Sequence, residues 1–485
     1  MKGLSMSSHE LISAIPFAIL GLGALGVLLL GVLPGKNNQQ LPYMGSIVVL
    51  LATMLSVASL FGHSANIENF VVIDHFTLVA FELFAAGGLA TILLAKNYPA
   101  LNKHVAEEFY ALILIAVLGT FILASASNLL AAFLGMETIA IPMFALIAWN
   151  PQRKGAIEGG LKYAVTATVA AAFFMFGIAL IYFGAGTIVI SEIPKALTSA
   201  NAMPMVALIG FMMLFVGICF ELALAPFHSW LADTLQASPA PVMAFIGSIA
   251  KIAMLTFVIH FVIQIEPIWD QISFVLWGFV LFSIVFGNLL AFRQTNIKRI
   301  LAYSSVAHFG YALMALTSVI PNSSASLSEA VHATAYYGLS YAVMNLVAFA
   351  VIAMLNKHNP TGELKGYRGL GRRYPLAGVA MAIAVLSLAG VPPTAGFFAK
   401  FFLFSSVLGN GYLGMVVLAA LASAVSVFYY LRILLAFFAK EEYHHHNQSA
   451  DVESVEFGST AVISVSAFAT IALGIFAQAA LTYMF

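Results

Sequence analysis

Six ionisable side chains stand inside apolar stretches of this chain, where a charge is costly. They are Glu82, Glu137, Glu221, Lys162, Lys251 and Lys400, and two histidines, His228 and His308, join them. A charge at the centre of a membrane helix costs roughly 2.5–3.5 kcal/mol on insertion scales, so such groups usually face a partner or a wet cavity. One such residue, for example Glu82, would fit a structural ion pair or a helix end at the interface. Six in one chain favour a shared function.

The chemistry that these side chains have in common is proton exchange. Carboxylates, amines and imidazoles in apolar surroundings can gain and lose protons, and a row of them bridged by water and hydroxyl groups conducts protons. Metal ligation is the competing interpretation, but no His-x-x-x-His or carboxylate–histidine pair occurs at helical spacing in the apolar stretches. The single cysteine, Cys219, excludes a disulfide scaffold and a thiolate cluster. For the polar run 444–446, a solvated loop is favoured over a metal site. We therefore predict a proton relay and no bound metal.

Two apolar stretches are interrupted by proline close to one of these charges. Pro226 follows Glu221 by five residues, and the pair Pro392-Pro393 precedes Lys400. Proline removes a helical hydrogen bond and breaks or kinks the helix. Helices broken at membrane depth in matching positions of two halves are typical of transporters built from repeats, and their free backbone groups can hold water or an ion.

Composition identifies the setting of these side chains. Of 485 residues, 62% are hydrophobic and only 8% are charged, and the mean hydropathy is +0.99. Globular proteins carry about 25% charged residues, so a soluble globular protein is excluded. The net charge is zero and no basic stripe stands out, so no nucleic-acid partner is expected. The composition predicts an all-α polytopic membrane protein.

The apolar stretches are long enough to cross a bilayer. A spanning helix needs about 20 apolar residues, and alternation of the kind found in outer-membrane barrels is absent. The first stretch is too long for a signal peptide and is taken as retained. We count fourteen candidate spans at residues 11–34, 42–61, 73–95, 108–126, 129–149, 161–185, 203–225, 240–264, 271–292, 299–320, 331–355, 376–408, 412–438 and 459–484.

Lysine and arginine residues between the spans predict the orientation. The odd-numbered loops hold about fourteen of them, and the N-terminus together with the even-numbered loops holds two. Because basic loops stay cytoplasmic, both termini are expected on the periplasmic side of a bacterial inner membrane. The loops are too short for a nucleotide-binding domain, and no phosphate-binding glycine motif occurs.

Seven motifs resemble those of a known family. The chain resembles the antiporter-like membrane subunits of respiratory complex I, the NADH–quinone oxidoreductase, most densely from about residue 105 to 440. Within that family, the stop directly after the last span favours a subunit type without a long lateral helix. The motifs are FLGME at 133–137, APFHSW at 225–230, SPAP at 238–241, SIAK at 248–251, QTNIKRILAYSS at 294–305, HFGY at 308–311 and LAGVPP at 388–393.

The resemblance implies two inverted five-helix repeats, each with one broken helix. It divides the chain into a three-helix segment at 1–104, a first repeat at 105–264 with spans four to eight, a second repeat at 265–440 with spans nine to thirteen, and a loop with the last span at 441–485.

The same resemblance implies roles for the buried ionisable residues. By the family pattern, Glu137 is the acid of the fifth span, Lys251 the central base of the eighth and Lys400 the base of the broken twelfth. Lys162 and His308 match further positions, with His308 on the route between the two lysines. His228 matches the broken seventh span.

One residue departs from the family pattern. A lysine normally stands in the seventh span opposite the fifth-span glutamate, and this chain has Glu221 there. Two carboxylates at close range do not both ionise readily. We therefore expect Glu137 and Glu221 either to share a proton or to be held apart by Lys162, and to titrate as a coupled set.

Three functions fit these observations. The resemblance implies a proton-translocating membrane-arm subunit, driven by NADH oxidation and reduction of a quinone, expected to be ubiquinone, in other subunits. The chain itself would bind no cofactor. Its expected neighbours are the antiporter-like subunit M, small subunits such as K, and membrane lipids. The alternatives are a subunit of a multisubunit cation/proton antiporter without redox partner and a structural subunit whose charges only hold helices together.

Overall fold

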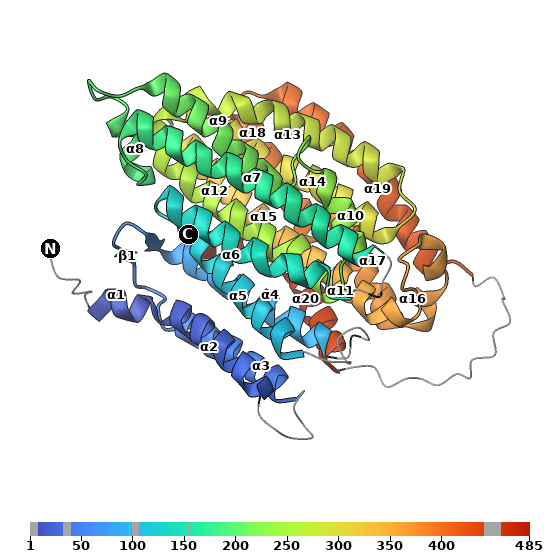
Figure 1. The fold of residues 1–485 in the computed structure, drawn as a ribbon. Coiled ribbons are helices and arrows are strands. Elements are labelled where there is room, and N and C mark those ends of the chain that lie inside the picture. The colour runs from blue at the N-terminus through green and yellow to red at the C-terminus, as the bar shows by residue number, and fades with distance from the viewer. Residues whose placement is uncertain are drawn as a thin grey trace.

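A bundle of long, roughly parallel helices makes up the molecule in Figure 1. The computed structural model describes residues 8–32, 40–96, 98, 106–150, 152, 155–440 and 457–485. Some of the residues used above for orientation, and the histidine run, lie outside these ranges. They are Lys2, Lys36, Lys103, Arg153, Lys154 and residues 444–446.

The helices follow the apolar stretches of the sequence closely. Short 3-10 turns η1 (Ile190–Glu192), η3 (Glu266–Ile268), η4 (Leu355–Lys357) and η5 (Leu364–Tyr367), and the π-helix η2 (Phe245–Ala250), interrupt or join them. The α-helices are α1 Ser8–Ser13, α2 Ile15–Val32, α3 Gln40–Ala58, α4 His75–Ala95, α5 Ala106–Ala124, α6 Leu129–Ile147, α7 Ala156–Ala185, α8 Ile193–Ala196, α9 Pro204–Glu221, α10 Ser229–Ala237, α11 Ala240–Ala244, α12 Lys251–Ile265, α13 Trp269–Phe292, α14 Ile297–Thr317, α15 Ser324–Met354, α16 Leu370–Arg373, α17 Pro375–Ala389, α18 Ala395–Gly409, α19 Leu413–Phe438, α20 Phe457–Ile475 and α21 Ala477–Met484.

The all-α polytopic fold predicted from composition is confirmed. Eleven helices in the described ranges are long and apolar enough to cross a membrane, or up to twelve if the pair Leu364–Arg373 and Pro375–Ala389, bent by 120°, forms one span. This total takes residues 240–292 as one helical segment and leaves out the shorter apolar helices Ile15–Gly31 and Ala395–Gly409. The count of fourteen spans and the repeat relationship stay predictions.

Both predicted helix breaks are present. Helix α9 ends at Glu221 and α10 begins at Ser229, with Ala223 between them in the left-handed region (φ 54°). Helix α17 ends at Ala389, Gly390 takes φ 88°, and α18 begins at Ala395. Glycine adopts this conformation without strain. Each break therefore leaves backbone carbonyls of the preceding helix without helical partners.

The outer surface of the bundle exposes large apolar side chains, as expected for a surface that faces lipid. Leu55 on α3, Leu435 on α19 and Phe468 on α20 each expose more than two thirds of their surface. At the blue edge of Figure 1, α2 and α3 pack on α4 and α5 and cover one flank of the bundle. The exposed leucines and phenylalanines follow from the bilayer as solvent, since lipid tails are as apolar as these side chains.

Hydrogen-bonded loops close one end of the bundle. Strands β1 (Ala65–Ile67) and β2 (Val71–Ile73) form an antiparallel hairpin between α3 and α4. Its backbone bonds to the short turn between α5 and α6 through Val72 N to Ser125 O (2.7 Å). In the same turn, the Ser127 carbonyl accepts a hydrogen bond from the Ile190 backbone N–H (3.1 Å). The two-residue gap between the fourth and fifth predicted spans is therefore part of a hydrogen-bonded turn that is fixed by two neighbouring segments.

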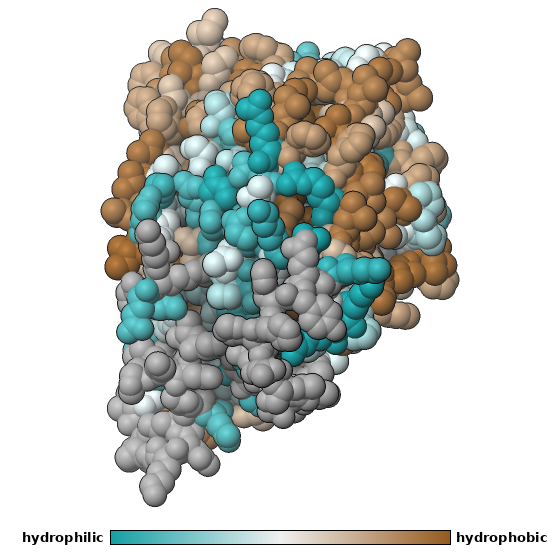
Figure 2. Space-filling view, turned by 90° about the vertical axis from the view of Figure 1, so that its right-hand side faces the viewer, coloured by the Kyte–Doolittle hydropathy of each residue, from teal (hydrophilic) through white to brown (hydrophobic). Residues whose placement is uncertain are grey.

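The opposite end carries the basic loops, and Figure 2 shows hydrophilic side chains gathered there between apolar flanks. Arg432 near the end of α19 donates to the carbonyls of Phe292 (2.7 Å) and Gln294 (2.9 Å) at the end of α13. A cation suits the negative end of a helix. Exposed basic side chains of the connection between α15 and α17 at this end are Lys357, Lys365, Arg368, Arg372 and Arg373.

A hydrogen-bonded carboxylate–histidine pair joins the N-terminal helices to the centre of the bundle at the hairpin end. Asp74 caps α4 by accepting from the Thr77 backbone N–H (2.8 Å), and its other oxygen lies 3.2 Å from His260 Nε2 on α12. Burial raises the pKa of Asp74, but the hydrogen bond and charge of His260 and the two Thr77 donors together hold the pKa well below its ordinary value. Sequence reasoning did not find this pair.

We predict that Asp74→Ala lowers the stability of the chain in its assembled form by about 1 kcal/mol at pH 7, because it removes a helix cap. Asp74→Asn keeps the cap and loses only the charge, so its loss should be smaller. Because the folded-state pKa is lowered, the ionic part is complete above the ordinary carboxyl pKa of about 3.9 and disappears as pH falls further. Thermal unfolding against pH measures this; a gap between wild type and Asp74→Asn that widens below pH ~4 contradicts it.

Candidate functional site

Lys251 lies at the centre of the bundle, where the break between α9 and α10 meets α12 and α14. Its side chain is buried (2% exposed). The ammonium donates to the carbonyl of Leu222 (3.3 Å), just beyond the end of α9, and to Ser305 Oγ on α14 (2.8 Å). It also stands 5.0 Å from the centre of the Phe309 ring. The broken helix thus supplies the carbonyl that a buried ammonium needs.

The carboxyl group of Glu221 lies within electrostatic range of this lysine. Glu221 is the last residue of α9 and interacts electrostatically with Glu137 of α6 and with Lys251. The Tyr163 side chain, fully buried on α7, lies within electrostatic range of both acids. Glu137 and Glu221 each keep part of their surface exposed in the single chain. The two acids expected to form a pair are therefore brought together.

Lys162 does not lie between those two acids, so the expectation that it holds them apart is wrong. It begins the second turn of α7, 46% exposed, and its ammonium pairs with Glu158 (2.8 Å) and Asp233 of α10 (2.9 Å). The reason is helical geometry, because Glu158 stands four residues before it on the same face. Lys162 belongs to a charged cluster at the basic end of the bundle.

That charged cluster surrounds an open pocket of about 490 Å³ lined by α7, α10 and the loop at 360–361. Asp233 accepts from Lys162 and also from Arg299 Nη1 on α14 (2.6 Å). Arg299 further contacts Gln236 Oε1 (3.0 Å). The cluster ties the helix after the first break to α14. Asp233 and Arg299 were not predicted as site residues. The signal that could have identified Asp233 is its position as an acid on the short amphipathic segment after a helix break.

Lys400 repeats the arrangement of Lys251 at the second break. It is 6% exposed on α18. Its ammonium donates to the carbonyls of Leu388 and Ala389 at the end of α17 (3.0 Å each) and to Ser423 Oγ of α19 (2.8 Å). The C-terminal end of a helix carries a partial negative charge. Each predicted lysine therefore donates to a backbone carbonyl at a helix break. Lys251 does so just after α9, and Lys400 does so at the end of α17.

His308 lies on α14 with its ring enclosed by hydroxyl groups. It is 3% exposed. Its Nδ1 is 2.6 Å from the Tyr337 hydroxyl of α15, and its Nε2 is 3.0 Å from the Tyr430 hydroxyl of α19. His308 also lies within electrostatic range of the Lys400 ammonium. Ser305, three residues earlier on α14, accepts a hydrogen bond from the Lys251 ammonium. The place of His308 on a route between the two lysines stays a prediction. The surrounding tyrosines were not predicted.

The other two predicted residues lie outside this row. His228 ends the first break, 6.2 Å from the ring of Tyr303 and within range of the Lys251 charge. Glu82 is partly exposed on α4, next to Leu83. Within the described ranges, no group of three histidine, cysteine or acidic side chains is close enough to hold a metal ion.

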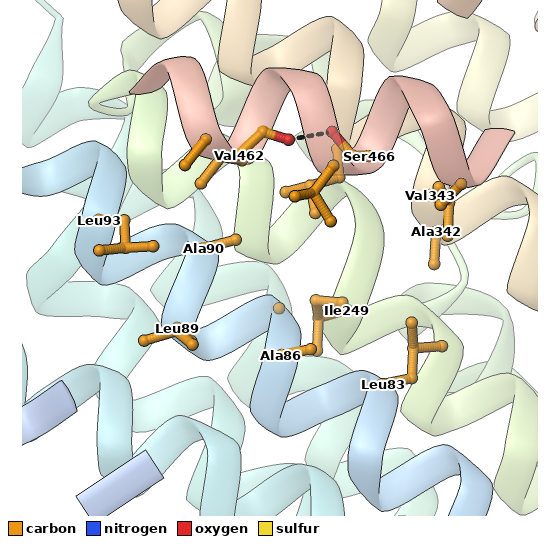
Figure 3. A pocket seen from close by; sticks show the side chains of 15 residues that line it. Leu83, Ala86, Leu89, Ala90, Leu93, Ile249, Ala342, Val343, Val462 and Ser466 are labelled. Carbon is orange, nitrogen blue, oxygen red and sulfur yellow. Dashed lines mark hydrogen bonds between the residues drawn. The ribbon is translucent and has the colours of Figure 1, made fainter. Parts of the chain in front are cut away.

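The helix that carries Lys251 is irregular just before it. The π-helix η2 ends at Ala250, and Ile249 reaches from it into an apolar pocket of about 300 Å³. Figure 3 shows Ile249 between Ala86 of α4 and Val462 and Ser466 of α20. π-Helical turns often occur at functional sites and turn the following side chains to a new face. Here the next residue with a charge is Lys251.

The chain is similar to known membrane proteins over most of its length. The family model described as "NADH:quinone oxidoreductase/Mrp antiporter, TM" matches residues 126–426, which include both breaks and both lysines. A protein of Geotalea uraniireducens (strain Rf4) named NADH-quinone oxidoreductase subunit N is 34% identical over 463 residues, 95% of each chain. One with the same name from Geobacter metallireducens is 36% identical over 432 residues, 88% of this chain and 89% of that one.

Solved structures share the fold over nearly the whole chain. A chain of respiratory complex I from Thermus thermophilus has a TM-score of 0.78 and 31% identity, covering 96% of this chain and 98% of that chain. An archaeal membrane-bound sulfane sulfur reductase gives a TM-score of 0.83 at 22% identity, and the Mrp complex of Dietzia gives 0.84 at 18%. Each covers 98% of this chain and 96% of its own. At those identities the last two show the fold alone.

We predict that Gly396→Ala destabilises the second break by about 1–3 kcal/mol, the usual cost of overpacking. An added methyl group would collide with the carbonyl oxygen of Ser387, and Gly396 N donates to Ser387 Oγ (3.0 Å). Gly278→Ala on α13 is the matched control, since nothing lies within 4 Å of its added carbon. Melting curves of the assembled protein compare them, and equal midpoints for the two variants would show that α17 and α18 do not interlock here.

Proposed function

Because this chain belongs to the NADH:quinone oxidoreductase/Mrp antiporter family, we propose that it translocates protons across a bacterial membrane as the subunit N of an NADH–quinone oxidoreductase. The relatives named subunit N match it over most of its length. The observation that carries the proposal is that Lys251 and Lys400 stand buried at the two helix breaks, with His308 and its hydroxyl partners on α14, α15 and α19 in the same core. A purely structural role would account for the two lysines at the breaks, but it would not require an imidazole bonded to two hydroxyl groups in the same core.

Each lysine is poised to hold or release a proton. An ammonium is stabilised by the break carbonyls and a serine hydroxyl, whereas burial favours the neutral amine. These opposing effects keep the protonated and neutral forms close in free energy. A change of charge nearby can then move the proton from one lysine toward the other. We propose that Lys251 takes up a proton from the first half of the chain and that Lys400 receives this proton from Lys251.

The acid pair supplies that change of charge for Lys251. Glu221 interacts with both Glu137 and Lys251, so its protonation state alters the free energy of the ammonium. In place of a lysine–glutamate switch, this chain would use two carboxyls that share one proton and titrate as a coupled set. His228, within range of Lys251, and the Lys162–Asp233 cluster at the basic end belong to the same half.

The remaining features of the proposal come from the relatives and from the loops. The chain would bind no cofactor itself, while NADH and a quinone, ubiquinone in our expectation, react in other subunits. Its neighbours would be other membrane-arm subunits, subunit M and small subunits such as K among them. Both termini would face the periplasm. Residues 105–264 and 265–440 would be the two inverted repeats, since α9–α10 and α17–α18 hold corresponding places in them.

A cation/proton antiporter without redox partner is the alternative, and the comparisons do not favour it. The likeness to the Mrp complex is one of fold at 18% identity, whereas the likeness to complex I includes 31% identity. Sodium-dependent pumping or sodium-dependent stabilisation of the purified protein would support the antiporter instead.

We predict that Lys251→Ala and Lys400→Ala each lower proton pumping and NADH–quinone turnover together by at least about a hundredfold, within the range of about 10²–10⁴ typical of lost acid–base groups. Lys365→Ala is the control, because that lysine is exposed at the basic end. Pumping is followed with a pH-sensitive dye in inverted vesicles holding the assembled complex. Full pumping by an assembled Lys251→Ala complex would refute the assignment.

For the acid pair, we predict that replacing either carboxyl changes the titration of the other. Difference infrared spectra of the assembled complex, recorded against pH for wild type, Glu137→Gln and Glu221→Gln, follow the carboxyl bands. The wild type should show two linked steps, and each single variant should show one step at a different pH. Two carboxyls that titrate independently near pH ~4 would contradict a shared proton.

A further inference from the structure

Five tyrosine side chains fill the space between Lys251 and Lys400. Each is about 1% exposed, and they come from α14, α15 and α19: Tyr311, Tyr337, Tyr341, Tyr429 and Tyr430. The chain holds 40 phenylalanines and only 17 tyrosines, so phenylalanine is its usual choice for an apolar site. A buried hydroxyl is costly unless it is hydrogen-bonded. A group of five hydroxyls in the core therefore indicates a local need for polar groups.

On the Lys251 side, the hydroxyls of Tyr430 and Tyr337 belong to a connected chain of hydrogen bonds. The Ser304 and Tyr430 hydroxyls are bonded to each other, and the Tyr430 hydroxyl lies 3.0 Å from His308 Nε2. His308 Nδ1 is bonded to the Tyr337 hydroxyl (2.6 Å). Ser304 and His308 are four residues apart and so share one face of α14. Its neighbour Ser305 accepts the bond from the Lys251 ammonium (2.8 Å).

On the Lys400 side, an asparagine fixes two further hydroxyls. Asn288 of α13 donates to the Tyr311 hydroxyl (3.2 Å) and accepts from the Tyr429 hydroxyl (2.9 Å). The Lys400 ammonium is 5.7 Å from the centre of the Tyr311 ring. The Tyr429 and Tyr430 rings lie 4.5 Å apart on α19. The two sides of the tyrosine group therefore meet at α19, next to His308.

We propose that Tyr430 is a proton-relay residue, whose hydroxyl passes the proton between the Ser304 hydroxyl and His308. This inference rests on the proposed function. In each passage the Tyr430 oxygen accepts one proton on one side and releases its own proton on the other, so no net charge stays on the ring. A hydroxyl can donate and accept at the same time. Its two partners, Ser304 and His308, stand about one helical turn apart on α14.

Comparison with the neighbouring Tyr336 separates a relay from a merely structural hydroxyl. The Tyr336 ring is fully buried too, but its hydroxyl donates to the backbone carbonyl of Leu473 (2.8 Å). That bond satisfies the hydroxyl and leads no further. Tyr430 instead bonds to a second hydroxyl and to an imidazole, two groups that exchange protons. A structural role would not require exchangeable partners on both sides.

The test uses Tyr430→Phe in the assembled complex, with Tyr336→Phe as the matched control. Each variant removes one buried hydroxyl and keeps the ring. Loss of a hydrogen bond in the path should slow pumping at least about fivefold in Tyr430→Phe and lower the number of protons moved per NADH oxidised. Tyr336→Phe should keep both quantities at the wild-type level. The solvent deuterium isotope effect on pumping should rise in Tyr430→Phe, which a structural change alone would not cause.

Three further variants keep the outcomes distinct. If Tyr430→Phe fails to assemble, Ser304→Ala removes the other partner of the same bond and should give the same loss of pumping; an assembled Ser304→Ala complex with normal pumping overturns the relay. If Lys251→Ala and Lys400→Ala abolish pumping while Tyr430→Phe pumps normally, the relay is wrong and the proposed function stands. If both lysine variants pump normally, the proposed function itself fails.

Discussion

A backbone carbonyl freed inside a membrane must find a donor, and in this protein the donor is a buried ammonium. Lys251 satisfies Leu222 beyond the end of α9, and Lys400 satisfies Leu388 and Ala389 at the end of α17. Neither feature is stable alone, because an unpaired carbonyl and an unpaired ammonium each cost several kcal/mol in hydrocarbon. Each break therefore requires its lysine, and each lysine requires its break.

This mutual dependence explains the arrangement of the remaining helices. Helix α14 is buried on nearly all sides and carries Ser304, Ser305 and His308 between the two lysines. Helices α15 and α19 bring hydroxyls to the same place. The exchangeable groups on these three helices therefore lie together in the core of the bundle. The halves differ at one point: Lys251 interacts with the acid Glu221, which interacts in turn with Glu137, whereas the bonds described for Lys400 go to carbonyls and a serine.

Most of the fold and part of the site could be predicted from the sequence. The apolar stretches gave the helices, and the prolines marked both breaks, because these signals are local. Lys251, Lys400 and His308 were found because a charge or an imidazole stands out in an apolar run. Lys162 was misplaced, since its partner Asp233 is 71 residues away and only the fold brings them together. The tyrosines escaped notice because a tyrosine in a membrane helix does not differ in pattern from an apolar core residue.

The central claim is that Lys251 and Lys400 act on the same proton, and a double-variant cycle tests it most directly. Pumping is measured in vesicles with assembled wild type, Lys251→Ala, Lys400→Ala and the double variant. If the two lysines serve one path, the double variant loses no more than the more severe single variant, because a path broken once is already closed. If the losses multiply, the two lysines act in separate paths and the account is wrong.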